Sequence, residues 1–129
     1  MSRVTVKDKE ELMELPFDQF QRYKTVSEFA DSIHREDKGP LKILDVGGYP
    51  GLITDFLPDD DITIVDVVPG DMPNYHQTKG GKLPFEDASF DLVCSCDTLE
   101  HVPAPDRQAF ILELARVSKD YLLIPAPFD

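Results

Sequence analysis

The chain has 129 residues, of which 13 are basic, 25 are acidic and 41% are hydrophobic, and its formal net charge is −12. This composition is typical of one soluble globular domain, so we expect a single domain over residues 1–129, with N-terminal helices over 1–40 and an α/β core over 41–129. The acidic balance argues against partners such as nucleic acid or an anionic membrane surface.

The ends and the cysteines of the sequence favour a cytoplasmic location. No apolar run follows the N-terminal charges, as a secretory signal requires, and no apolar stretch approaches the roughly 20 residues of a membrane span. Cys94 and Cys96 are the two cysteines of the chain and lie too close together to close a disulfide loop. Neither they nor His34 and His76 have the spacing of metal ligands, so we expect no metal site.

The first forty residues predict helices. Apolar residues recur at every third or fourth position from 17 to 33, which is the spacing of one face of an amphipathic helix. A shorter helix is expected over Asp8–Leu15, where Pro16 would end it, and Gly39 and Pro40 end the helical region. The apolar face comprises Phe17, Phe20, Tyr23, Val26, Ala30 and Ile33.

Four short apolar runs follow, and each predicts a strand. They are nearly continuous and rich in Ile, Val and Leu, which is typical of a parallel sheet covered on both faces. Helical segments over Pro50–Leu57 and Pro105–Ser118 alternate with them. We therefore predict an α/β fold, Rossmann-like and doubly wound, with a mostly parallel sheet flanked by helices. The runs are Leu41–Val46, Ile62–Val68, Phe90–Cys96 and Tyr121–Ile124.

The turn after the first predicted strand is rich in glycine, at Gly47, Gly48 and Gly51. In doubly wound folds the ligand lies beyond the carboxyl ends of the strands, and glycine lets the backbone approach it. This spacing differs from the Gly-x-Gly-x-x-Gly of a dinucleotide site, and the Gly-Lys-Ser/Thr ending of a phosphate-binding loop is absent. The turn therefore predicts a ligand without a pyrophosphate.

Asp66 ends the second predicted strand, roughly 20 residues past the glycines. An acid there is placed to accept hydrogen bonds from the two hydroxyls of a ribose. Glycine turns are common and Asp often caps a helix, so each signal alone also has a purely structural interpretation. On two neighbouring predicted strands, the two signals together favour a nucleoside ligand.

The segment Ile43–Gly51 resembles the first motif of the class I S-adenosylmethionine-dependent methyltransferases. That motif is an acid followed by Gly-x-Gly-x-Gly, and it is matched here at Asp45, Gly47 and Gly51, with Tyr49 in place of the middle glycine. The resemblance covers about residues 41–126 and is closest to members that act on small molecules. It continues in Leu83–Val93, Leu99–Pro103 and the helical stretch Arg107–Val117.

The resemblance implies S-adenosylmethionine as the cofactor and a small molecule as the methyl acceptor. It implies that the turn holds the methionine portion, that Asp66 holds the ribose and that Val67 lies against the adenine. Family members commonly place an acid at the adenine amino group, where this sequence has Lys79. The cofactor-binding residues implied are Asp45, Gly47, Gly48, Tyr49, Gly51, Asp66, Val67, Gly80, Cys96 and Asp97.

Methyl transfer from a sulfonium depends mainly on positioning, and it needs a general base only where the acceptor must lose a proton. His101 is the candidate for that base, because histidine exchanges protons near neutral pH. Glu100 and Asp97 are candidate orienting groups. The structural alternative is that His101 satisfies a backbone carbonyl in a loop.

Two departures from the family concern the sheet. The link from Asp66 to Leu83 is short, so we expect the helix after the second strand to be missing or reduced to a loop. The sequence ends just past Tyr121–Ile124, which corresponds to the family's fifth strand, whereas the family's sheet usually has two more strands, so we expect a sheet truncated after strand five. That strand would be an exposed edge, and we expect either a homodimer through this edge or a cover of N-terminal helices.

An alternative function is a non-catalytic domain that keeps the methyltransferase fold and binds a partner. Tyr49, Lys79 and the early chain end favour it. A nicotinamide-dependent dehydrogenase is a weaker alternative, because the glycine spacing opposes it.

Overall fold

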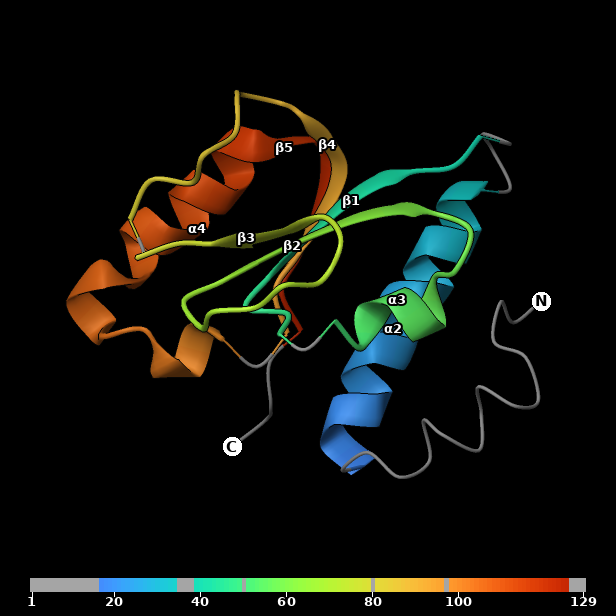
Figure 1. Ribbon diagram of the computed structural model, residues 1–129, viewed down its shortest axis with the longest axis horizontal. Coiled ribbons are helices and arrows are strands. Elements are labelled where there is room, and N and C mark those ends of the chain that lie inside the picture. The colour runs from blue at the N-terminus through green and yellow to red at the C-terminus, as the bar shows by residue number, and fades with distance from the viewer. Residues whose placement is uncertain (1–16, 35–38, 50, 80, 97, 126–129) are drawn as a thin grey trace.

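The structure is a computed structural model that describes residues 17–34, 39–49, 51–79, 81–96 and 98–125. Five parallel strands form one sheet in the order β3-β2-β1-β4-β5 (Figure 1). The predicted Rossmann-like α/β fold is therefore confirmed. The strands are β1 (Lys42–Val46), β2 (Asp61–Asp66), β3 (Tyr75–Gln77), β4 (Phe90–Cys94) and β5 (Ser118–Leu123).

Helices cover both faces of the sheet. Figure 1 shows α2 (Phe17–His34) and α3 (Ile53–Phe56) on one side and α4 (Arg107–Val117) on the other. Two short 3-10 helices, η1 (Leu99–His101) and η2 (Ala104–Asp106), connect β4 to α4. No helix within the described ranges is both long and apolar enough to cross a membrane.

Each face of the sheet has its own apolar core. The predicted face of α2 packs through the buried Tyr23, Val26 and Ala30 onto a cluster that includes Ile43 and Leu92 of the sheet. On the opposite face Leu114 and Val117 of α4 join Leu44, Val46, Val65, Leu83, Phe90 and Val93. The predicted helix over Asp8–Leu15 lies outside the described residues.

The edge strand β5 is half-buried along its apolar part. The ring of Phe29 on α2 packs edge-on against that of Tyr121, with 5.3 Å between centroids and an interplanar angle of 79°. The N-terminal helix thus covers one face of β5. The edge-to-edge homodimer stays a prediction.

The third strand was not predicted, because Tyr75–Gln77 is short and contains no apolar run. Pairing with β2 creates it: the N–H of Ile64 donates to the carbonyl of Asn74 at 2.9 Å, and that of Thr78 to the carbonyl of Asp66 at 2.8 Å. No helix lies between Asp66 and Tyr75, as the short link predicted.

Candidate functional site

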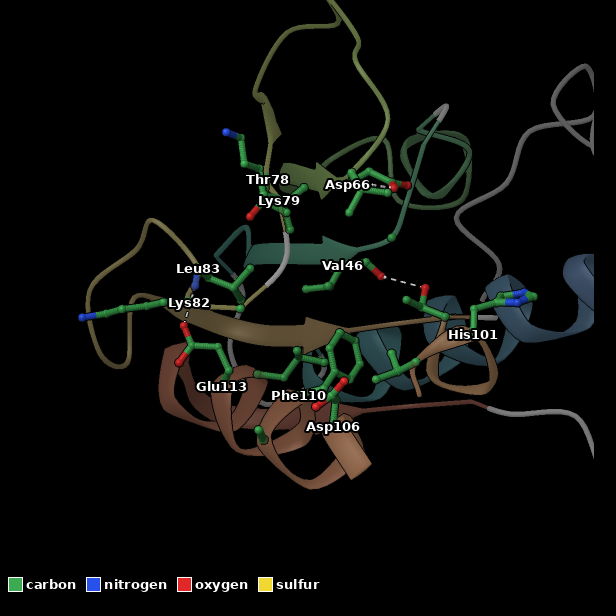
Figure 2. A pocket seen from close by; sticks show the side chains of 18 of the residues that line it. Val46, Asp66, Thr78, Lys79, Lys82, Leu83, His101, Asp106, Phe110 and Glu113 are labelled. Carbon is green, nitrogen blue, oxygen red and sulfur yellow. Dashed lines mark hydrogen bonds between the residues drawn. The ribbon is translucent and has the colours of Figure 1, made fainter. Parts of the chain in front are cut away.

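A pocket of about 750 Å³ lies where the carboxyl ends of the strands meet the start of α4. Val46, Asp66 and Thr78, at or just past the ends of β1, β2 and β3, line one side, and Phe110 and Glu113 of α4 line the other (Figure 2). A pocket of this volume suits a small molecule, and doubly wound sheets bind their ligands at the carboxyl ends of the strands. This pocket is therefore the candidate site.

The glycines of the turn after β1 are required by packing within the protein. Gly47 has φ +79°, and a Cβ there would lie 2.1 Å from Oγ1 of Thr98. A Cβ on Gly48 would lie 2.3 Å from Oδ2 of Asp45. Of the three glycines of the turn, Gly47 lines the pocket, while Gly48 and Gly51 do not. The glycine signal in the sequence therefore reports close packing of the turn as well as proximity to a ligand.

The end of β4 holds the turn in place. The carbonyl of Val46 accepts hydrogen bonds from Oγ of the buried Ser95 at 2.9 Å and from Oγ1 of Thr98 at 3.3 Å. The N–H of Gly47 donates to the carbonyl of Val65 at 2.7 Å. The peptide that joins β1 to the turn is thus fixed on both sides before any ligand arrives.

Asp45 lies beneath this turn and is completely buried. Its Oδ1 accepts a hydrogen bond from the thiol of Cys94, with 3.8 Å between Oδ1 and Sγ. Its Oδ2 has no hydrogen-bond partner in the described part of the chain. Burial raises the pKa of the Asp45 carboxyl to about 7, the hydrogen bond from Cys94 opposes this shift, and the charge of Asp66 adds to it. Asp45 does not line the pocket.

Asp66 lines the pocket and has a fixed orientation. Its Oδ2 accepts a hydrogen bond from the backbone N–H of Tyr49 at 3.0 Å, and its Oδ1 accepts one from the backbone N–H of Val67 at 2.7 Å. A carboxylate oxygen can accept two hydrogen bonds, so both oxygens keep acceptor capacity for a ligand. The ring of Tyr49 packs edge-on against Tyr75, with 6.1 Å between centroids, and does not line the pocket.

The opposite wall is held by Arg116 of α4. Its guanidinium donates to both carboxylate oxygens of Glu113 at 2.8 Å, to Asp87 at 2.8 Å, and to the carbonyls of Phe85 at 2.9 Å and Leu83 at 3.1 Å. The hydrogen bonds from Arg116 lower the pKa of the Glu113 carboxyl. The segment that follows β3 is thereby fixed to α4.

The pocket unites some of the predicted residues and leaves others outside. Gly47, Asp66, Val67 and the candidate base His101 line it, as does Lys79. Asp45, Gly48, Tyr49, Gly51 and Cys96 do not line it. Gly80 and Asp97 lie outside the described residues. Across the described ranges, no group of three or more His, Cys, Asp or Glu side chains could hold a metal ion.

Much of the lining was not predicted. Val46, Leu83, Val102 and Pro103 lie in segments that carry the family resemblance but were not predicted as site residues. Phe110 and Leu114 have helical spacing that indicates only a core-facing stripe. The unpredicted lining includes Val46, Val65, Thr78, Gly81, Lys82, Leu83, Thr98, Val102, Pro103, Asp106, Ala109, Phe110, Glu113 and Leu114.

Three of the known proteins to which this chain is similar are described here. The chain is 41% identical to 27-O-demethylrifamycin SV methyltransferase of Amycolatopsis mediterranei over 54 residues, which is 36% of this chain and 19% of that protein. PH0226 protein from Pyrococcus horikoshii has a similar structure, with a TM-score of 0.60 and 20% identity, covering 83% of this chain and 59% of that one. Magnesium protoporphyrin IX methyltransferase from Synechocystis, solved with bound S-adenosylmethionine, gives a TM-score of 0.59 at 17% identity, covering 88% and 64%.

The chain spans less than two thirds of the length of each of these proteins. The structural likenesses at these identities bear on the fold alone. Residues 44–121, more than half of the chain, match the family model described as a methyltransferase domain. The chain therefore belongs to the methyltransferase domain family, and its fold is that of the class I S-adenosylmethionine-dependent methyltransferases.

Proposed function

We propose that this domain binds S-adenosylmethionine in the pocket and transfers its methyl group to a small-molecule acceptor. The observation that carries the proposal is the Asp66 carboxylate, which two backbone N–H groups hold at the pocket wall beside the turn after β1. Two similar proteins, by their names, act on a rifamycin and on a porphyrin, and both of these acceptors are small molecules.

The pocket lining fits this cofactor. The Asp66 carboxylate can accept hydrogen bonds from the two ribose hydroxyls of the cofactor. The apolar side chains of Val65, Leu83 and Phe110 can contact its flat base. The Tyr49 ring, which favoured a non-catalytic module at the level of sequence, packs on Tyr75 and leaves the pocket open. The cofactor, when bound, supplies a methyl group already activated by a sulfonium.

The chain's own residues then have a positioning role. Ser95 and Thr98 fix the turn through the carbonyl of Val46, so the pocket needs little rearrangement on binding. His101, at the end of η1, lines the pocket and is the proposed base for an acceptor that must lose a proton.

Isothermal titration calorimetry with S-adenosylmethionine and S-adenosylhomocysteine tests the proposal. We expect saturable binding of both ligands to one site and a rise in melting temperature with each. NAD⁺ serves as the control and is expected to give no heat, because the turn lacks a pyrophosphate-binding spacing. Absence of heat and of a thermal shift at millimolar S-adenosylhomocysteine would contradict the proposal.

A further inference from the structure

One arginine attaches the segment between β3 and β4 to α4. The guanidinium of Arg116 donates hydrogen bonds to the carbonyl of Phe85 at 2.9 Å and to that of Leu83 at 3.1 Å. The backbone carbonyl of Arg116 accepts the N–H of Ala88 at 2.8 Å, so the attachment continues almost to the start of β4. Arg116 itself does not line the pocket. Any effect of this residue on a ligand must therefore pass through the residues that it holds.

The backbone of Ala88 indicates that this attachment overrides a local preference. Ala88 has φ +53°, in the left-handed region that a residue with a Cβ seldom adopts. Such a conformation persists where the surrounding structure imposes it. The hydrogen bond from Ala88 to Arg116 is one such constraint. The conformation of the segment is thus set in part by its contacts with α4.

The attachment reaches the pocket wall through Leu83 and Glu113, which both line the pocket. The N–H of Leu83 donates to the Glu113 carboxylate (Figure 2), and the Arg116 guanidinium holds both oxygens of that carboxylate at 2.8 Å. Leu83 is therefore held at its N–H and at its carbonyl by one connected set of hydrogen bonds. Its side chain is 5% exposed and packs in the apolar cluster beneath α4.

Packing restrains the chain less on the other side of Leu83. Gly81 has φ +74°, and among the described residues only its chain neighbours come within 4 Å of a Cβ built there. Lys82, which follows it, is exposed. The position of Leu83 at the pocket wall therefore depends on its contacts with α4 more than on the residues that precede it.

From this arrangement we propose that Arg116 is a positioning residue for ligand binding. Through Glu113 and the backbone of Leu83, it holds the part of the pocket wall that contacts the base of the cofactor. The inference rests on the proposed function, which places that base against Leu83. A dissociation constant rises in proportion as the fraction of chains with an ordered wall falls, so Arg116 sets the affinity without touching the ligand.

Two ligands that share the base and differ at the methionine end test the inference by calorimetry. They are S-adenosylhomocysteine and 5′-methylthioadenosine, which lacks the amino acid group. Arg116→Met keeps a long side chain and removes its donors, so both dissociation constants are expected to rise by about tenfold and by the same factor. Arg116→Lys can still donate to Glu113, so both constants are expected to stay within about threefold of the wild-type values.

Asp87→Asn is the matched control within the same set of contacts. Asp87 accepts a hydrogen bond from Arg116 at 2.8 Å, but its side chain is 81% exposed and does not line the pocket. Exposed ion pairs contribute little, so both dissociation constants are expected to stay within about twofold of the wild-type values. Circular dichroism and the melting temperature check that each variant is folded.

Hydrogen exchange separates positioning from a purely structural role. In free Arg116→Met the Leu83 N–H is expected to lose protection, because the wall opens more often. Saturating S-adenosylhomocysteine selects the ordered wall and is expected to restore most of that protection. A residue that only stabilised the fold would not link the protection of Leu83 to the ligand.

The paired measurements separate the outcomes. Equal weakening of both ligands in Arg116→Met, with Asp87→Asn unchanged, supports the inference. Unchanged affinity in a folded Arg116→Met overturns it, as does a loss confined to S-adenosylhomocysteine, which would place the effect at the methionine end. If Arg116→Met does not fold, Arg116→Gln takes its place under the same criteria. If the wild-type chain binds neither ligand, the proposed function fails first and this inference fails with it.

Discussion

The turn after β1 and the segment after β3 both line the pocket and are both held by hydrogen bonds, yet they differ in what they require of the sequence. The turn requires glycine, because side chains at Gly47 and Gly48 would overlap Thr98 and Asp45. The segment after β3 is fixed by the hydrogen bonds of one arginine, Arg116, to its carbonyls. Close packing restricts residue type and leaves a motif in the sequence, whereas carbonyl acceptors are present in every residue and leave none.

The largest expected effect concerns the buried acid beneath the turn. The pKa of Asp45 is about 7 in the folded chain against an ordinary value of 3.8, so between these pH values the folded state binds the proton more tightly than the unfolded state. Stability from this group is present below pH 3.8 and is lost as the pH rises to about 7. The loss is on the order of 4 kcal/mol over this range.

Asp45→Asn removes this titration. Urea denaturation of wild type and variant between pH 4.5 and pH 8 is expected to show the variant gaining stability relative to wild type as the pH rises. A difference between the two proteins that does not change with pH would mean that the carboxyl is not held in an unfavourable buried state.

The next largest effect tests the packing of the turn. A Cβ on Gly48 would lie 2.3 Å from Oδ2 of Asp45, so Gly48→Ala is expected to cost roughly 2 to 3 kcal/mol of unfolding free energy. Gly81→Ala is the control: Gly81 has φ +74° and nothing within 4 Å of an added Cβ, so only backbone strain of about 1 kcal/mol is expected. If both changes cost the same free energy of unfolding in urea denaturation, close packing is not the reason that position 48 requires glycine.

The smallest effect is local and concerns the other wall. Arg116→Lys keeps the charge but loses the planar fork of donors, so the segment after β3 should open more often. The Leu83 N–H, which donates to Glu113, is expected to exchange with deuterium roughly tenfold faster. The Gly47 N–H, which donates to Val65, should exchange at its wild-type rate. Equal acceleration at both amides would show that the two walls open as one unit.

The sequence predicted the elements that carry a continuous apolar pattern. The runs at Ile62–Val68 and Phe90–Cys96 became β2 and β4, and the stripe from 17 to 33 became α2. The strand β3 escaped prediction because its residues are polar and become a strand only through pairing with β2. Likewise β5 begins at Ser118 rather than Tyr121, because the polar Ser118 pairs with Phe90 of β4.

The apolar pattern of the strands also made part of the candidate site predictable. Asp66 stands at a strand end whose position the apolar pattern sets, and it lies at the pocket. Asp45 belongs to the same motif, but its depth below the turn depends on the neighbouring β4 and has no sequence signal. Asp106 and Phe110 come from an element far along the chain, and only the packing of α4 on the sheet brings them to the pocket.

The most direct test of the cofactor site compares the contributions of Asp66 and Asp45 to cofactor binding. Calorimetry with S-adenosylhomocysteine at pH 8 is carried out on the wild-type chain and on Asp66→Asn and Asp45→Asn, which make the same chemical change. We predict that Asp66→Asn weakens binding by roughly 1.5 to 3 kcal/mol, the scale of hydrogen bonds to a charged group, and that Asp45→Asn changes the dissociation constant by less than about threefold. Full affinity in Asp66→Asn, or an equal loss in both folded variants, would contradict the assignment of the pocket wall at Asp66 as the cofactor site.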